Sequence, residues 1–313
     1  MNNMKTLNSL RVVIAIITLG LFTWNAGAQN SAQLQEKTVK VGEFSSLEVT
    51  GDFEVTLAKG DYSTKVTVSS VLADYIEVYV RTGVLHIGLN EKAIPKDVKK
   101  DLKGKNAPEQ VFRAVVYTPR INSITLEDNA VLTGLNEFSC SSFALKLEDK
   151  AQLKTLSVIA SSATVSLRDK SQATILLTVN NDIELKTDGS STLRATVDGQ
   201  QLSLNVGGTS KSSVDATVET VALDADGRAE LTLSGKARTL TVKGNRNMNV
   251  DASALPVEEV DATLGGGDLS VKVEKIITAD LTGGAELYFN GTPEIKLKRV
   301  VKSTLAPVSE KKK

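Results

Sequence analysis

The chain has little of several residue types, and each shortage excludes a class of function. Its 313 residues include one cysteine, Cys140, and one histidine, His86. A single cysteine cannot build an intramolecular disulfide framework or a multi-cysteine metal cluster, and a single histidine excludes a multi-histidine metal site. The 37 basic and 37 acidic side chains cancel, so the chain lacks the strong positive field that binding to nucleic acid requires.

Aromatic residues are also scarce, at 4% of the chain, although hydrophobic residues reach 41%, as in a globular protein. No aromatic residue lies between Phe143 and Tyr288, so this long stretch offers no ring on which a sugar could stack. His86 alternates with Leu85 and Ile87 and is expected on the surface of a strand, and no nucleophile motif accompanies it. Cys140 is expected to be a small buried hydrophobe. We therefore predict no enzyme, with no catalytic, cofactor-binding or metal-binding residues.

Residues 1–28 have the pattern of a secretory signal peptide. Lys5 and Arg11 supply positive charge beside an apolar run from Val12 to Phe22, and the small residues of Ala26-Gly27-Ala28 suit signal peptidase. The apolar run is shorter than the ~20 residues that span a bilayer. We expect an exported protein, located in the periplasm, on the outer-membrane surface or outside the cell, without a transmembrane segment in the mature chain.

From about residue 121 onward, one short pattern recurs with a mean spacing of about 19 residues. It consists of two aliphatic residues separated by one residue that is usually polar. The copies are Ile124/Leu126, Leu145/Leu147, Val165/Leu167, Ile183/Leu185, Leu202/Leu204, Val221/Leu223 and Leu240/Val242, with weaker ones at Ala262/Leu264 and Ala279/Leu281. Such alternation predicts strands with one buried face. The turns that follow are rich in Asp, Asn and Gly, which tolerate left-handed backbone angles.

Repeated coils of this length, each with two or three short strands, predict an all-β parallel β-helix, a solenoid. No proline lies between Pro119 and Pro256, which fits strands whose amides all bond to neighbouring coils. A β-sandwich remains the alternative, because it is also built from short strands and turns. The solenoid prediction requires stacked aliphatic side chains, namely Leu147, Leu167, Leu185, Leu204 and Leu223.

The expected domain organisation follows from this repeat. A linker is expected over 29–37, a single β-helix domain over 38–302, and a disordered basic tail over 303–313. Within the domain we expect a β-rich N-terminal layer or cap over 38–120, with a solvated Lys-rich loop over 91–110, and the coils with a C-terminal cap over 121–302.

Three aspartates, Asp128, Asp149 and Asp169, occupy equivalent turn positions in consecutive coils. Carboxylates stacked ~5 Å apart would repel by roughly 0.8 kcal/mol per pair in water. One interpretation is that calcium lies between them, because calcium favours several oxygen ligands. The other, which we adopt as the expectation, is that aspartate serves turn geometry and solubility.

Three stretches carry a resemblance to a known family: GDFEVTLAKGD at 51–61, AVVYTPRINSITLEDNA at 114–130 and LTGGAELYFNGTPEI at 281–295. They resemble the bacterial auto-transporter adhesin, head GIN domain family, and the likeness covers roughly 38–302. The resemblance implies a right-handed β-helix at the cell envelope, typical of Bacteroidetes-type bacteria. It supplies no catalytic residues to carry over.

The function predicted from these observations is a non-enzymatic adhesion or interaction scaffold of the cell envelope. A rod with polar residues in outward rows suits multivalent contact with a protein or a polysaccharide. Two alternatives stay open: a glycan-active β-helix lyase or hydrolase, and a periplasmic housekeeping or envelope-stress binding protein.

Overall fold

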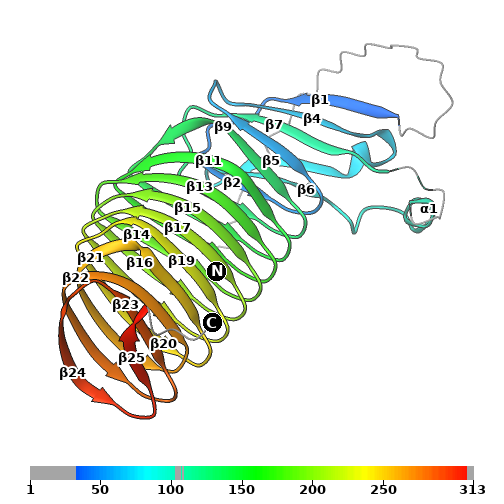
Figure 1. Cartoon of the computed structure of the whole chain (residues 1–313). Helices are drawn as coiled ribbons and strands as arrows, with labels where there is room; N and C mark the ends of the chain where they lie inside the picture. Colours follow the sequence, from blue (N-terminus) through cyan, green and yellow to red (C-terminus); the bar gives the residue numbers. More distant parts are fainter. Residues whose placement is uncertain (1–32, 103–106, 108, 309–313) are drawn as a thin grey trace, which may run out of the picture.

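The computed structural model describes residues 33–102, 107 and 109–308. They form an elongated all-β molecule, a parallel β-solenoid with coils of about 19 residues (Figure 1). This architecture confirms the predicted fold class. The predicted signal peptide, 1–28, lies outside the described residues. None of the helices in the described part is long and apolar enough to cross a membrane.

Each coil contributes strands to two ladders of parallel strands, which we call ladder A and ladder B. Ladder A contains β2 (Ser46–Val49), β8 (Ser123–Leu126), β10 (Ser142–Leu147), β12 (Ser162–Leu167), β14 (Asp182–Thr187), β16 (Gln201–Val206), β18 (Thr220–Ala225) and β20 (Thr239–Asn245). Ladder B contains β3 (Glu54–Ala58), β9 (Val131–Ser139), β11 (Gln152–Ala160), β13 (Gln172–Val179), β15 (Thr192–Asp198), β17 (Lys211–Thr217) and β19 (Glu230–Lys236).

The C-terminal coils continue both ladders. The long strands β21 (Asn249–Gly265) and β22 (Asp268–Leu281) each run through ladder B first and then through ladder A. They are followed by β23 (Glu286–Asn290) in ladder B, β24 (Glu294–Val300) in ladder A and β25 (Thr304–Pro307) in ladder B.

The N-terminal end of the rod is built differently from the coils. Its strands are β1 (Leu34–Val39), β4 (Ser63–Ser69), β5 (Ile76–Arg81), β6 (Val84–Leu89) and β7 (Phe112–Tyr117), with a 3-10 helix η1 (Ser70–Tyr75) and a short α1 (Lys96–Asp101). β6 and β7 pair parallel with β2 and β3 and so add one more coil. Three antiparallel pairings then follow: β5 pairs with β6, β4 pairs with β7, and β1 pairs with β4. Ladder A therefore ends in β5, and ladder B ends in β1.

Period-two alternation of the sequence places one set of side chains inside the coils. In β13 every second residue is buried, from Ala173 to Val179. Stacking of the coils joins these side chains into one continuous apolar core. Because a single coil cannot bury its own apolar face, this stacking is the main stabilising contribution in a solenoid.

The five leucines predicted to stack all lie in ladder A, but they form two adjacent columns instead of one. Leu185, Leu204 and Leu223 stack directly on one another, and the residue stacked before Leu185 is Val165. Leu147 and Leu167 form the adjacent column two residues along the strand, and the next coil continues it with Thr187. The sequence pattern had aligned Leu167 with Leu185. A shift of two residues leaves the same side chains facing inward, so the pattern cannot detect it.

Two predicted boundaries are also wrong. β1 begins at Leu34, inside the predicted linker 29–37, because this strand pairs antiparallel with β4. β25, Thr304–Pro307, lies inside the predicted disordered tail 303–313, because it pairs with β23. The predicted Lys-rich loop, 91–110, contains the short helix α1, none of whose residues is buried.

In five successive coils, the turn that leads from ladder A to ladder B has a small residue on its inner side, and in the next coil this position is Met248. Ala151, Ser171, Ser191, Ser210 and Ala229 occupy this position in successive coils, all almost fully buried. The Ser171 and Ser210 hydroxyls each donate to a carbonyl of their own turn at 2.7 Å. Among the described residues, none is a hydrogen-bond partner of the buried Ser191 hydroxyl oxygen. The hydroxyl groups at this position therefore differ in what they contribute.

Candidate functional site

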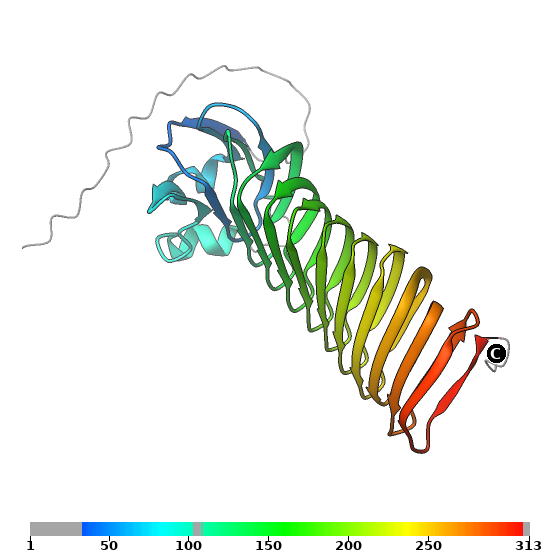
Figure 2. The ribbon, with the colours of Figure 1, turned by 90° about the vertical axis from the view of Figure 1, so that its left-hand side faces the viewer.

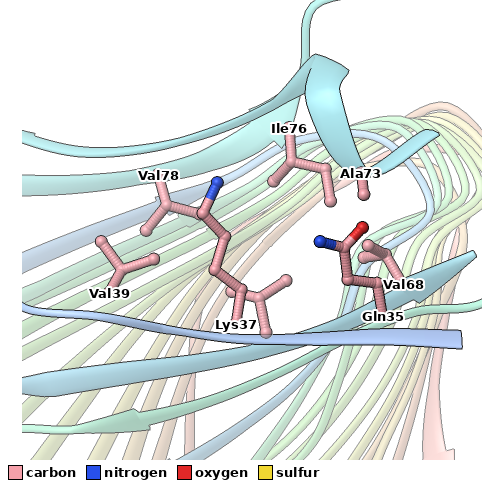
Figure 3. Close-up of a pocket in the computed structure, with 8 residues that line it drawn as sticks. Gln35, Lys37, Val39, Val68, Ala73, Ile76 and Val78 are labelled. Atoms are coloured by element: carbon pink, nitrogen blue, oxygen red, sulfur yellow. The ribbon is translucent and has the colours of Figure 1, made fainter. Parts of the chain in front are cut away.

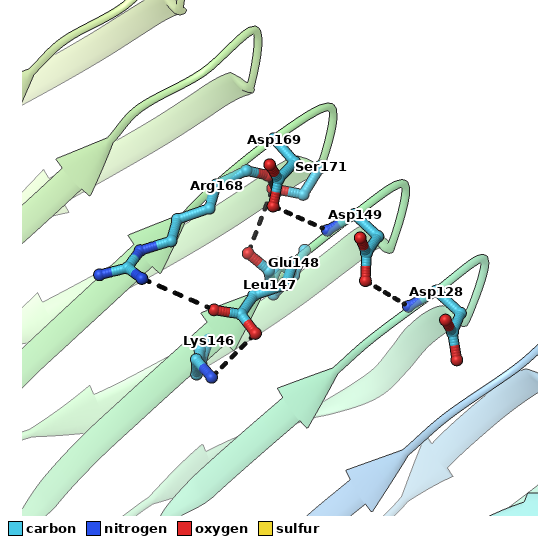
Figure 4. A network of polar contacts seen from close by, with 8 residues as sticks. All are labelled: Asp128, Lys146, Leu147, Glu148, Asp149, Arg168, Asp169 and Ser171. Atoms are coloured by element: carbon cyan, nitrogen blue, oxygen red, sulfur yellow. Dashed lines mark hydrogen bonds and ion pairs between the residues drawn. The ribbon is translucent and has the colours of Figure 1, made fainter.

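The three stacked aspartates are explained by the geometry of their turns. Asp128, Asp149 and Asp169 all have left-handed backbone angles, with φ of 61°, 57° and 59°. Their carboxylates accept backbone amides of the preceding coil (Figure 4): Gly51 N–H donates to Asp128 Oδ2 at 2.9 Å, and the amides of Asp128 and Asp149 lie 3.4 Å from the next carboxylate along the row. Aspartate tolerates this conformation and accepts hydrogen bonds locally, as expected for a turn residue.

The calcium interpretation of this row finds no support in its geometry. In the next three coils the left-handed position is occupied by glycine, Gly189, Gly208 and Gly227. A Cβ atom at Gly189 would lie 2.8 Å from the backbone nitrogen and oxygen of Asp169, so the carboxylate row cannot continue. Among the described residues, no group of three His, Cys, Asp or Glu side chains is arranged to hold a metal ion.

The outer face of ladder A carries charged side chains in exposed pairs. Glu148 contacts Lys146 at 3.0 Å and Arg168 at 3.9 Å across two neighbouring strands (Figure 4). Lys186 and Glu184 form a similar pair at 2.7 Å on β14. Exposed ion pairs of this kind stabilise a fold by at most about 1 kcal/mol each. They make this face polar and well solvated.

His86 lies on the same outer face, as predicted from its alternation with Leu85 and Ile87. Its Nδ1 is 3.4 Å from Glu48 Oε2 on the neighbouring strand. Its ring stacks on Tyr79 with centroids 4.9 Å apart and an interplanar angle of 21°. The imidazole therefore contacts Glu48 and Tyr79 on the outer surface of its strand.

Cys140 is free and half-buried at the turn between β9 and β10, where it packs against the core. Partial burial raises the pKa of its thiol, because desolvation disfavours the thiolate. The prediction of a fully buried position is therefore too strong, whereas its packing role agrees with the structure.

A small cavity lies at the N-terminal end of the rod, between β1 and β4 on one side and η1 and β5 on the other (Figure 3). Its volume is about 110 Å³, and six valine, alanine and isoleucine side chains from these elements surround it. Gln35 and Lys37 of β1 are the polar residues of its wall. The wall contains no carboxylate, whereas a glycoside hydrolase needs two.

Carboxylates do line two open hollows elsewhere, but ion pairs hold several of them. One hollow of about 630 Å³ includes Glu219 and Glu258. Glu219 is 3.5 Å from Arg238 Nε, and Glu258 is 2.9 Å from Lys275 Nζ. The other hollow, of about 350 Å³, includes Asp226, which pairs with an arginine at 3.1 Å. Other carboxylates also line these hollows, including Asp198 and Glu274 in the first and Asp188 and Asp224 in the second.

The most unusual surface feature is a group of apolar side chains on the outer face of ladder B, which we call the apolar patch. Its members are Tyr117, Leu135, Ile159 and Leu176, with exposed fractions of 39%, 63%, 37% and 42%. They come from β7, β9, β11 and β13. Ile159 and Leu176 are diagonal neighbours, because Leu176 pairs with Ser157, two residues before Ile159. Tyr117 pairs with Ala58 of β3, and β3 also pairs with β9.

A β-bulge shapes the middle of the apolar patch. Between two paired positions, β9 has the residues Gly134, Leu135 and Asn136, whereas β11 has Leu156 alone. A Cβ atom at Gly134 would lie 2.6 Å from a methyl carbon of Leu156, so a larger residue there would require that side chain to move. Bulges re-aim side chains and are frequent next to functional sites. The sequence pattern did not predict this patch, since its only signal was apolar residues at positions where neighbouring coils have polar ones.

Comparison with known proteins identifies relatives of this fold. The family described as "Putative auto-transporter adhesin, head GIN domain" matches the chain twice, over residues 43–175 and 156–293. No curated protein matches the sequence.

Solved structures also resemble the chain at low identity. A protein described as a putative adhesin from Parabacteroides distasonis is 16% identical, with a TM-score of 0.49, and the match covers 88% of this chain and 98% of that one. A second putative adhesin, from Parabacteroides merdae, is 13% identical with a TM-score of 0.45, over 88% and 96% of the two chains. A protein described as a putative lipid binding protein from Parabacteroides distasonis is 14% identical with the same TM-score and coverage.

Proposed function

The chain belongs to the auto-transporter adhesin, head GIN domain family, and from this premise we propose that it is a non-enzymatic interaction scaffold of the cell envelope. In this proposal the protein is exported, and it contacts a partner protein through the apolar patch on ladder B. The remaining outer surface is largely polar and keeps the rod in solution.

The observation that carries the proposal is the contrast between the apolar patch and the same columns in neighbouring coils. Ile159 stacks between Ser139 and Thr178, and Leu176 stacks between Ser157 and Thr196. The fold therefore accepts small polar side chains at these outward positions. Ile159 and Leu176 are diagonal neighbours on adjacent strands, and exposed apolar groups that gather in this way are typical of protein–protein contact surfaces. Tyrosine, present at Tyr117, is among the residues that contribute most to binding.

The arrangement of the rod supports the same interpretation. The strands that carry the patch each pair with a neighbouring strand on both sides, so the patch lies on a stiff surface. Binding to a stiff surface costs little conformational entropy, which favours affinity. The apolar patch is the feature that favours a scaffold function over a lyase or hydrolase.

A patch variant tests the proposal. Ile159→Thr combined with Leu176→Thr copies the residues of the following coils and retains strand propensity. We expect this variant to fold normally and to lose the partners that crosslink to the wild-type protein in intact envelopes. The matched control, Lys186→Thr on the outer face of ladder A, should keep them. Equal crosslinking of the same partners by the wild type, the patch variant and the control would refute the patch as the contact surface.

Protease treatment of intact cells tests the location. Degradation without lysis would support display at the surface, where adhesion operates. Protection would support a periplasmic binding protein instead, with the same patch as its contact surface.

A further inference from the structure

The end of the rod farthest from β1 is open, because no further strand of the described residues covers it. Figure 2 shows β24 and β25 as the last strands at that end, β24 in ladder A and β25 in ladder B. Within the described residues, β24 pairs only with β22, and β25 pairs only with β23. Each strand therefore has one edge whose backbone groups are available to a further strand.

The inward-facing side chains of β24 are exposed, unlike those of every earlier coil. Ile295, Leu297 and Val300 are 42%, 59% and 38% exposed. In the preceding coil, the same three columns hold Ile277, Ala279 and Leu281, each 0% exposed. Solenoids normally end in a capping repeat with a polar outer face, because an uncovered core favours association. The described residues leave this surface of β24 uncovered.

We propose that a second copy of this chain covers it, in a two-fold dimer in which β24 pairs antiparallel with β24 of the second copy. Such a contact is isologous, the commonest kind in homo-oligomers. The same two-fold axis brings β25 beside β25 of the second copy, because the spacing between ladders A and B is identical in both molecules. A partner of another shape would match one edge at most. The proposal does not depend on the apolar patch, which lies on other strands.

The charges along β24 suit an antiparallel copy. An antiparallel contact centred on Lys296 places Glu294 opposite Lys298 of the second copy at both ends of the contact, so opposite charges meet there. Lys298 Nζ already lies 3.3 Å from both carboxylate oxygens of Asp261. Its ammonium group has three donors and can therefore bridge Asp261 and the second copy's Glu294. On the inner side, Ile295 meets the second copy's Leu297, which buries both.

One residue opposes the dimer. Lys296 lies at the centre of this register, opposite Lys296 of the second copy, and like charges directly opposite each other on paired strands are destabilising. Thr278 occupies the same column one coil earlier. Replacing Lys296 by threonine therefore removes the repulsion with a residue that the column already accepts. The geometry predicts tighter association from this change, whereas a loss of apolar contact should weaken it.

The test is sedimentation equilibrium of the purified protein over a range of concentrations, with scattering to measure the length of the particle. We expect a reversible dimer about twice as long as the monomer. Leu297→Lys should weaken association at least about tenfold by placing an unpaired charge in the contact. Lys296→Thr should tighten it about two- to fivefold.

A matched control separates the end contact from general surface hydrophobicity. Leu135 is also a highly exposed leucine, at 63%, but it lies on the apolar patch of ladder B. Leu135→Lys should leave the dimer unchanged, and circular dichroism should show all three variants folded. A wild-type protein that is monomeric at every concentration, or a dimer that survives Leu297→Lys, would overturn the proposal.

Discussion

The stacked turns between ladders A and B can be tested with three glycines that differ in two separable ways. Gly42 has no positive φ, and a Cβ atom added there would have no other atom within 4 Å. Gly51 has φ of +81° and equally open surroundings. Gly208 has φ of +65°, and a Cβ atom there would lie 2.5 Å from the Gly189 carbonyl oxygen. Alanine at Gly42 should therefore add neither strain nor a clash. Alanine at Gly51 should add backbone strain alone, and alanine at Gly208 should add strain together with a clash.

The magnitudes follow from these differences. Gly42→Ala should change the free energy of unfolding by less than about 0.5 kcal/mol, as for most surface substitutions. Gly51→Ala should cost about 1–2 kcal/mol, because an L-residue in the left-handed region brings Cβ against the following carbonyl. Gly208→Ala should cost about 1–3 kcal/mol more than that, because relief of the clash requires backbone movement.

The Gly189 carbonyl cannot retreat freely from the new methyl group. It accepts the amide of Thr209 at 2.7 Å and the hydroxyl of the same residue at 3.1 Å. A shift that relieved the clash would weaken this link between successive coils. The cost at Gly208 therefore measures how tightly the turns stack.

Urea unfolding followed by circular dichroism measures the three costs, and amide hydrogen exchange locates the loosened coil. For Gly208→Ala, faster exchange should centre on the turns around Gly189 and Gly227. Equal costs for Gly51→Ala and Gly208→Ala would refute the reasoning, because they would mean that the turns are not in contact. A cost at Gly42 similar to that at Gly51 would show that φ is not the cause.

Three further predictions concern single side chains and the aspartate row. Ser171→Ala should destabilise the protein by about 0.5–1.5 kcal/mol by removing a buried hydrogen bond, whereas Ser191→Ala should be neutral or stabilising because its hydroxyl has no partner within the described part of the chain; thermal unfolding compares the two. The raised pKa of the Cys140 thiol keeps it protonated at neutral pH, so a thiol reagent should label the folded protein more slowly than the unfolded one, and labelling should accelerate as the pH rises. Added calcium should leave the melting temperature unchanged, because the Asp128–Asp169 carboxylates accept backbone amides; a rise would restore the metal interpretation.

Much of the fold could be predicted from the sequence because the signals are local. Alternation marks the strands of the coils, and Asp or Gly marks most left-handed turn residues, as at Asp149 and Gly208, although Arg246 takes this conformation in one turn. The recurrence of these signals at a nearly constant spacing predicts that the strands stack in parallel. The strands at Leu34–Val39 and Thr304–Pro307 escaped prediction, because each is held by pairing with a distant strand rather than by its own pattern.

The sequence by itself therefore determined which residues form the strands of the repeating coils, which face their side chains take and where these coils turn. Only the tertiary structure decided the stacking register, since a shift of two residues preserves the inward face and places Thr187 where leucine was expected. It also decided which apolar residues stay exposed. Leu176 and Leu297 have the same side chain as the buried Leu204, and what differs is the presence or absence of a neighbouring layer over them. Exposure is a property of that packing, and no local pattern encodes it.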